Sequence, residues 1–236
     1  MKKLILFGLT LILVTLGNNS FSQSLRNKEV ALIAFNCNVN QAILQLLDEF
    51  SQDFPEVENP KCNKYMNAIK MNSWSMIEDM LRAEFNIYML PLNTFGKSFS
   101  YDQYGFPNVN INRALRQGAS RFYLKADLIF TQIAKPIEIG ASSRTNKENG
   151  DDEEEYDPNS FIPEVTITLT FYTNKGIIPL QKVTGIAQAS TPWNVSDELL
   201  NGLVNDERYD TEPAKSIMGL FRQAMKDVFK NFPLQR

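Results

Sequence analysis

The sequence predicts a single α/β (α+β) domain, built on a mixed sheet of about five strands with helices packed on at least one face. Three observations lead to this fold class. The 236 residues are 43% hydrophobic and 22% charged, which is typical of a globular domain rather than a disordered chain. In the first half of the chain, short apolar segments typical of strands alternate with segments of helical period. In the second half, three strand-like segments follow one another, which predicts an antiparallel meander.

The first 22 residues are predicted to be a secretory signal peptide. Two lysines precede an apolar run over 4–16, and small serines precede a predicted cleavage site before Gln23. That run is too short to span a bilayer, and no later stretch reaches the roughly 18 apolar residues of a membrane helix. The first cysteine, Cys37, lies too far along the chain for lipid attachment. We therefore expect the mature domain, 23–236, to be periplasmic or secreted, with no integral membrane segment.

The composition excludes several kinds of chemistry. The chain has no histidine, so it cannot form a Ser-His-Asp triad, a Cys-His dyad or a zinc site with imidazole ligands. No glycine-rich phosphate loop and no Gly-x-Ser-x-Gly motif occurs. The formal charge of −3 becomes −5 when the two lysines of the signal peptide are removed, and the remaining basic residues are scattered. These features predict no enzymatic activity, no cofactor, no metal and no nucleic-acid partner.

The two cysteines leave two alternatives open. Cys37 and Cys62 lie 25 residues apart in a chain predicted to be exported. A disulfide between them is one alternative, and closing such a loop would stabilise the fold by about 3 kcal/mol. Two separate reduced thiols are the other. Without a histidine to activate it, neither cysteine is expected to be a catalytic nucleophile.

The first strand and the helices that follow it are predicted from apolar runs and spacing. Residues 30–35 form a continuous apolar run typical of a strand buried on both faces, and the polar residues at 36–38 are expected to end it. Apolar side chains at helical spacing predict one helix over 40–50 and a second over 73–85. The prolines in 54–60 predict a loop between the two helices.

The middle of the chain combines two strands with a short helix. Residues 87–92 read as a short strand ended by proline, and a polar, aromatic-rich loop follows over 98–107. A short helix is predicted over 110–117, with Gly118 at its carboxyl cap. Alternating apolar residues then predict a strand over 121–133.

The last part of the chain contains an acidic insert, a hairpin and a helix. The insert at about 140–160 is expected to be a flexible hairpin loop, and its run of acids at 151–155 is expected to be solvated rather than to bind calcium. Strands are predicted over 165–172 and 177–189, and an amphipathic helix is predicted over 213–231.

Seven segments are considered together by their order and spacing: the apolar strand ending near Phe35, Met80 to Phe85, Ile87 to Pro91, Gly118-Ala119, Lys125 to Ile129, Val165 to Leu169 and Asn174-Lys175-Gly176. In this order they resemble the small α/β domain of envelope assembly proteins. These include the curli-secretion channel lipoprotein, the periplasmic activators of penicillin-binding proteins and the N-terminal domain of the Tol-system propeller protein. In those families the domain is a docking platform, so the resemblance implies a protein partner in the cell envelope.

Four aromatic residues in predicted loops are the candidate ligand-binding or partner-binding residues. Tyr101, Tyr104, Phe106 and Trp193 lie where neither helix nor strand packing explains an apolar side chain. They could stack on sugars or on peptide, or they could anchor the loops to the core; the sequence leaves both alternatives open.

The acid pairs carry a further alternative. A carboxylate-based hydrolase needs two acids that face each other across a cleft. The candidate pairs are Glu78 with Asp79 and Asp197 with Glu198. Adjacent acids on one helix point in different directions, which favours simple solvation.

Taken together, these features of the sequence predict an exported, non-catalytic binding or assembly module of the bacterial cell envelope that docks a protein partner. The alternatives are a glycan or small-ligand binder that uses the loop aromatics, and a hydrolase.

Overall fold

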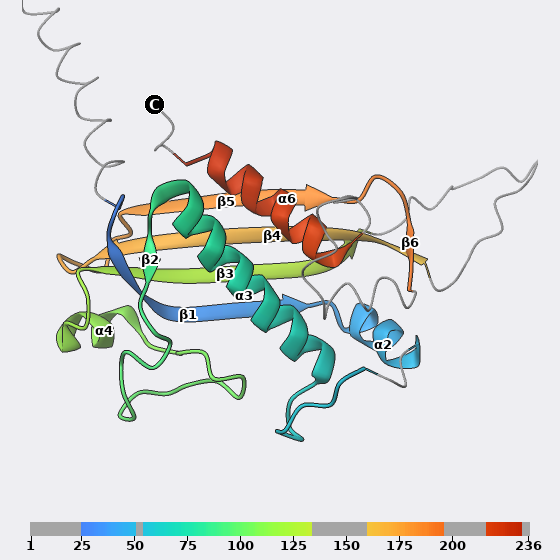
Figure 1. Cartoon of the computed structure of the whole chain (residues 1–236), viewed down its shortest axis with the longest axis horizontal. Helices are drawn as coiled ribbons and strands as arrows, with labels where there is room; N and C mark the ends of the chain where they lie inside the picture. Colours follow the sequence, from blue (N-terminus) through green and yellow to red (C-terminus); the bar gives the residue numbers. More distant parts are fainter. Residues whose placement is uncertain (1–24, 51–53, 134–159, 196–215, 233–236) are drawn as a thin grey trace, which may run out of the picture.

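A mixed sheet forms the centre of the molecule in the computed structural model, which describes residues 25–50, 54–133, 160–195 and 216–232 (Figure 1). Its strand order is β2-β1-β3-β4-β5, and β6 pairs with the first two residues of β4. The strands are β1 (Glu29–Val39), β2 (Tyr88–Met89), β3 (Phe122–Ile133), β4 (Ser160–Thr173), β5 (Gln181–Gln188) and β6 (Trp193–Asn194). β1 runs parallel to β2 and β3, whereas β3, β4 and β5 form an antiparallel meander. The predicted mixed sheet is confirmed.

Helices cover both faces of this sheet to different extents. The described helices are α2 (Gln41–Phe50), α3 (Lys64–Phe85), α4 (Ile111–Gln117) and α6 (Ile217–Lys230). α3 and α6 lie side by side across one face, and α2 follows the end of β1 (Figure 1). α4 lies on the opposite face, where its Ala114 packs with Ile33 and Tyr123 in a second, smaller core. None of the helices in the described ranges is long and apolar enough to cross a membrane.

Local sequence signals set the ends of these helices. Asn63, Asn110 and Ser216 are the amino-terminal caps of α3, α4 and α6, and each accepts a hydrogen bond from a backbone N–H of the first turn. Gly118 ends α4 with a φ of 70°, as its position after the helical segment predicts. Asn86 ends α3 with a φ of 52°, a left-handed conformation that asparagine tolerates better than most residues.

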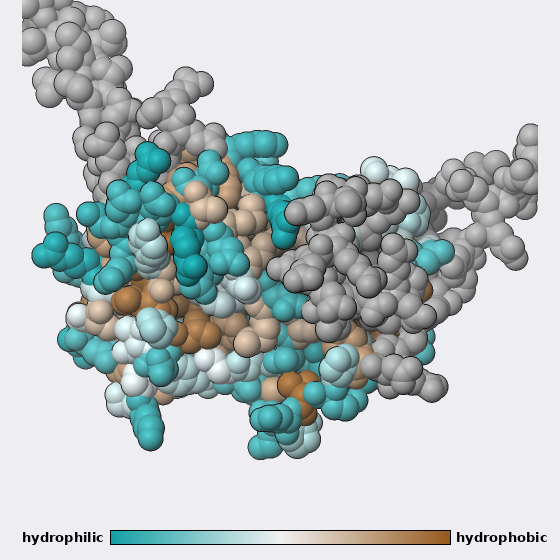
Figure 2. All heavy atoms as spheres, in the orientation of Figure 1, coloured by the Kyte–Doolittle hydropathy of each residue, from teal (hydrophilic) through white to brown (hydrophobic). Residues whose placement is uncertain are grey.

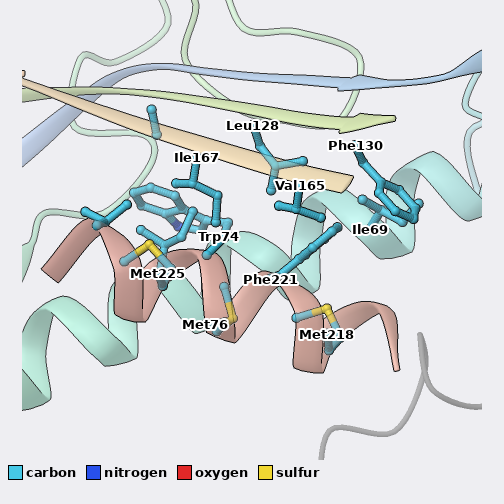
Figure 3. Packing of buried hydrophobic residues seen from close by; sticks show 14 of the residues in the cluster. Ile69, Trp74, Met76, Leu128, Phe130, Val165, Ile167, Met218, Phe221 and Met225 are labelled. Atoms are coloured by element: carbon cyan, nitrogen blue, oxygen red, sulfur yellow. The ribbon is translucent and has the colours of Figure 1, made fainter. Parts of the chain in front are cut away.

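The main core lies between the sheet and the pair formed by α3 and α6. Figure 3 shows Trp74 and Met76 of α3 beside Met225 of α6, beneath Leu128 and Ile167 of the sheet. These residues belong to one continuous cluster of buried side chains, so a single apolar layer holds both helices on the sheet. On the outer surface of this side of the molecule, hydrophobic residues form several separate areas among hydrophilic ones (Figure 2).

Three of the wrong predicted boundaries lie in the first half of the chain. β1 continues through the polar residues at 36–38, because its backbone keeps pairing with β3 as far as Val39. α3 starts at Lys64 instead of Ser73, since Asn63 caps an additional stretch of helix whose apolar residues are interrupted by polar ones. Of the strand predicted over 87–92, only the two residues of β2 are paired.

Two predicted segments lie outside the described residues. These are the signal peptide over 1–22 and almost all of the acidic insert at 140–160. Export and the acidic hairpin therefore stay predictions.

Candidate functional site

A pocket of about 290 Å³ opens beside the second half of β1. Its wall combines backbone and side chains from β1 with residues from α3, from the loop before α4 and from β3. The lining residues are Phe35, Asn36, Cys37, Asn38, Lys70, Asp102, Pro107, Asn108 and Asp127. Amides, one ammonium and two carboxylates predominate, so the pocket is rich in hydrogen-bonding groups.

The pocket begins where the loop before α4 leaves the edge of β1. Val109 donates its backbone N–H to the carbonyl oxygen of Ile33 at 2.8 Å, and Asn108 forms an antiparallel bridge with Ala34. These contacts cover the edge of β1 up to Ala34. The chain then turns away, and residues 35–38 border the open pocket.

Lys70 contributes a buried charge to the wall of the pocket. The residue is only 5% exposed, and its Nζ forms an ion pair with the carboxylate of Asp102. Three ring centroids lie 5.0 to 5.6 Å from the same Nζ, those of Phe106, Tyr104 and Phe35. Both the carboxylate and the faces of the rings stabilise a buried ammonium ion.

Asp102 is held in place by its own loop. Its Oδ1 accepts the backbone N–H of Tyr104 at 3.0 Å and that of Phe106 at 2.9 Å. The Asp102 backbone N–H also donates to the Phe106 carbonyl at 2.8 Å, which closes a tight turn. One carboxylate therefore orders the loop and neutralises Lys70 at the same time.

A second ion pair lies on the opposite wall. Asn36 and Asp127 are register partners in the parallel pair of β1 and β3, so their side chains emerge on the same face. The Asn36 Nδ2 donates to Asp127 Oδ1 at 2.6 Å, and the Lys125 Nζ lies 3.0 Å from the same oxygen. Each carboxylate of the pocket is thus already paired with a lysine.

Cys37 and Cys62 are free thiols in the structure, so the disulfide alternative is not realised here. Cys37 lies in β1 against the main core, whereas the Cys62 thiol donates to the carbonyl oxygen of Gln103 at 3.3 Å. Burial raises the pKa of the Cys37 thiol to about 12; nearby Lys70 acts in the lowering direction and Asp102 in the raising direction. Cys37 therefore stays protonated at neutral pH, which makes it a poor nucleophile.

The four predicted binding aromatics lie in different surroundings. Phe106 is fully buried, with its ring edge-on to those of Phe35 and Trp74 at centroid distances of 5.2 and 6.2 Å. Tyr104 is half-buried over Lys70, next to the pocket. The Tyr101 hydroxyl donates to the Gly96 carbonyl at 3.2 Å.

Trp193 is far from the other three. It is 6% exposed on β6, beside Phe161, and β6 lies at the opposite end of the sheet from α4 (Figure 1). The structure thus groups Tyr104 and Phe106 around Lys70, places Tyr101 in the same loop and separates Trp193 from all of them. Their role in binding a ligand or partner stays a prediction.

The acid pairs named from the sequence lie elsewhere or outside the described residues. Glu78 forms an ion pair with Arg82 on the surface of α3 at 3.2 Å, and Asp79 is exposed. Asp197 and Glu198 fall in a range that the structure does not describe. In the parts of the chain that are described, no three cysteine, aspartate or glutamate residues come together as a metal-binding group.

The sequence analysis missed Lys70, Asp102 and Asp127. Lys70 lies one helical turn before Trp74, on the buried face of α3. A helix prediction extended to Lys64 would have revealed a lysine among core positions, and that is the signal that could have identified the site. Asp102 and Asp127 carried no comparable local signal, because only the fold brings them to one pocket.

Comparisons with known proteins give weak likenesses. No protein-family model matches the chain, and no curated protein matches it in sequence. The crystal structure of lipoprotein GNA1162 from Neisseria meningitidis is similar with a TM-score of 0.33 and 12% identity, over 75% of this chain and 92% of that one. The hypothetical protein CT253 from Chlamydia trachomatis has a TM-score of 0.37 and 12% identity, over 87% and 98%.

The C-terminal domain of LpoB from Salmonella enterica is similar with a TM-score of 0.29 and 8% identity, over 68% of this chain and 82% of that domain. At TM-scores this low, no shared function follows from any of the three likenesses. The resemblance to envelope assembly proteins stays a prediction.

Proposed function

We propose that this protein is an exported, non-catalytic binding module of the cell envelope that docks a protein partner at the pocket beside β1. The observation that carries the proposal is the outer backbone edge of β1 after Ala34, which none of the described segments pairs with. A strand edge beside a hydrogen-bonding pocket is a surface that another polypeptide can complete.

The chemistry of the pocket supports binding over catalysis. Asp102 is bonded to Lys70 and to two backbone N–H groups, and Asp127 is bonded to Lys125 and Asn36. These bonds already engage both carboxylates with groups of the protein itself. The Cys37 thiol, with its raised pKa, offers no thiolate at neutral pH.

The predicted signal peptide and the absence of histidine support the same proposal from the sequence. An exported chain without the residues of the common hydrolytic sites is suited to a role in which its surface binds and positions another protein.

Site-specific photo-crosslinking tests this function. A photoreactive phenylalanine analogue replaces Asn108, whose exposed side chain lines the pocket, and in a control chain it replaces the exposed Lys175 of the β4–β5 turn. Irradiation in the intact envelope should give one discrete adduct from position 108 and none from position 175. The captured protein, purified, should bind the chain directly, and Asn108→Trp should weaken that binding at least about tenfold. Equal adducts at both positions, or none at either, would contradict the proposal.

A further inference from the structure

The two long edges of the sheet are protected differently. On the β5 side, α6 lies along the outer strand and caps its backbone: the Asp227 Oδ2 accepts the N–H of Ile186 at 3.1 Å, and the Asn231 Nδ2 donates to the carbonyl of Thr184 at 3.0 Å. Such side-chain capping prevents another strand from adding at that edge.

On the β1 side, the direction of the backbone groups can be read from the pairing with β3. Asn40 donates its N–H to the carbonyl of Phe130 at 2.8 Å, toward β3. Backbone groups of successive strand residues point to alternate edges, so Asn38 also bonds toward β3, whereas the N–H and C=O of Cys37 point the other way. That direction is the one in which the pocket opens.

Among the described residues, no backbone or side-chain group bonds to the outward N–H and C=O of Cys37. The last partner on this edge is the segment 107–109, opposite Ala34. The pocket therefore lies directly beyond the short antiparallel pairing of segment 107–109 with β1. An added strand that extended this pairing along β1 would occupy the pocket.

We propose that this free edge of β1 binds an extended segment of the partner polypeptide through main-chain hydrogen bonds to Cys37. The inference rests on the proposed function and deepens it, because it specifies what the partner presents. The charges of the pocket favour such an occupant: Lys70 is neutralised by Asp102 and Asp127 by Lys125, so the site accepts an uncharged hydrogen-bonding group in preference to an ion.

Lys70 adds a further donor to this site. An ammonium has three N–H donors, and Asp102 is the one hydrogen-bond acceptor that Lys70 has among the described residues. One of the remaining N–H groups of the Lys70 ammonium can donate to a carbonyl oxygen of the bound main chain.

Amide hydrogen exchange tests whether the edge is free. In the unbound full chain, the amide of Cys37 should exchange at least about tenfold faster than those of Asn36 and Asn38, which bond toward β3. A Cys37 amide that is as protected as Asn38 would overturn the proposal, because the edge would then be covered already.

A library of short random peptides supplies the probe for binding. The best binder is then resynthesised with a methyl group on each backbone nitrogen in turn. Methylation of the one nitrogen that donates to the Cys37 carbonyl should weaken binding about tenfold, with little effect at the two neighbouring nitrogens, since those face away from β1. The binder should also protect the Cys37 amide, and it should lose affinity for the Asn108→Trp variant but not for Lys175→Trp.

Other outcomes separate this inference from the proposed function. If no peptide of the library binds, or if methylation of neighbouring nitrogens weakens binding equally, main-chain addition at β1 is wrong. An envelope partner that crosslinks at position 108 would then still support docking through side chains. If peptides bind as described but no envelope protein crosslinks, the edge site is correct and the proposed function is wrong.

Discussion

At the scale of single residues, Lys70 is the residue on which the pocket depends. It lies on the buried face of α3, where an apolar side chain is expected, and its charge is stabilised by Asp102 and by the surrounding rings. Removing one partner of a buried ion pair leaves the other charge without compensation, whereas removing both can cost much less. This difference makes the pair testable by a double-mutant cycle.

Asp102→Asn should lower the free energy of unfolding by about 3 kcal/mol, because the ammonium of Lys70 stays buried without a counter-charge. The asparagine keeps a side-chain oxygen that can accept the N–H groups of Tyr104 and Phe106, so the loop is preserved. Adding Lys70→Met to Asp102→Asn should restore part of the loss, because a methionine fits among the rings without a charge. Urea unfolding of the two single variants and the double variant measures the cycle; strictly additive effects would show that the two charges are not coupled.

Residue roles could be predicted from the sequence where the signal is local. Gly118 was predicted as a helix cap because it directly follows a short helical segment, and it has the expected positive φ. The pairing of Lys70 with Asp102 joins residues 32 positions apart, and nothing near either residue indicates the other. The Cys37 pKa likewise depends on burial that only packing creates.

At the scale of elements, the contact between β5 and α6 is unusually close. A Cβ atom added at Gly185 would lie 2.2 Å from the carbonyl oxygen of Ala224 and 2.3 Å from the backbone nitrogen of Val228. Both atoms belong to the helix backbone, which cannot move aside as a side chain can. Gly185 therefore sets the distance between strand and helix.

Gly185→Ala should destabilise the protein by about 3 kcal/mol, because α6 must shift away from the sheet to admit the methyl group. Gly176→Ala is the matched control: no atom lies within 4 Å of its added Cβ, and the change in stability should stay within about 0.5 kcal/mol. Chemical denaturation of both variants provides the comparison. If the two substitutions had equal effects, close packing at Gly185 would not be the cause.

The elements themselves were predictable to the extent that their apolar pattern is regular. The three strands of the meander were predicted in the right order, although β4 starts at Ser160 instead of Val165 and β5 at Gln181 instead of Ile177. β1 extends beyond its apolar run because its backbone also pairs with β3 at the polar residues 36–38. The first turns of α3 were missed because the helix begins with residues whose pattern is mixed, and Asn63 rather than hydrophobicity determines its start.

At the scale of the whole molecule, the sheet has one capped edge and one edge with a free stretch. Asp227 of α6 and Asn231, the carboxyl cap of that helix, lie one helical turn apart, and both bond to the backbone of β5. An open strand edge can pair with a strand of a second chain. The side chains of Asp227 and Asn231 therefore help to prevent association through β5.

The double substitution Asp227→Ala with Asn231→Ala should therefore promote self-association as well as lower stability by about 2 kcal/mol, since two hydrogen bonds are lost. Sedimentation velocity over a range of concentrations should show a rising mean mass for this variant. Lys226→Ala, an exposed change on the same helix, should remain like the parent protein. If the double variant stays monomeric at every concentration, these side chains do not protect the edge.

By itself, the sequence determined the mixed sheet, its meander and the helices on its faces, because hydrophobic periodicity and helix caps act over a few neighbouring residues. It also excluded histidine chemistry outright. Only the tertiary structure decided where a site can form. The pocket needs the segment 107–109 to pair with the outer edge of β1 no further than Ala34, α3 to place Lys70 in the wall and a distant loop to place Asp102 there. Contacts between segments far apart in the chain are set by packing, which leaves no trace in local sequence.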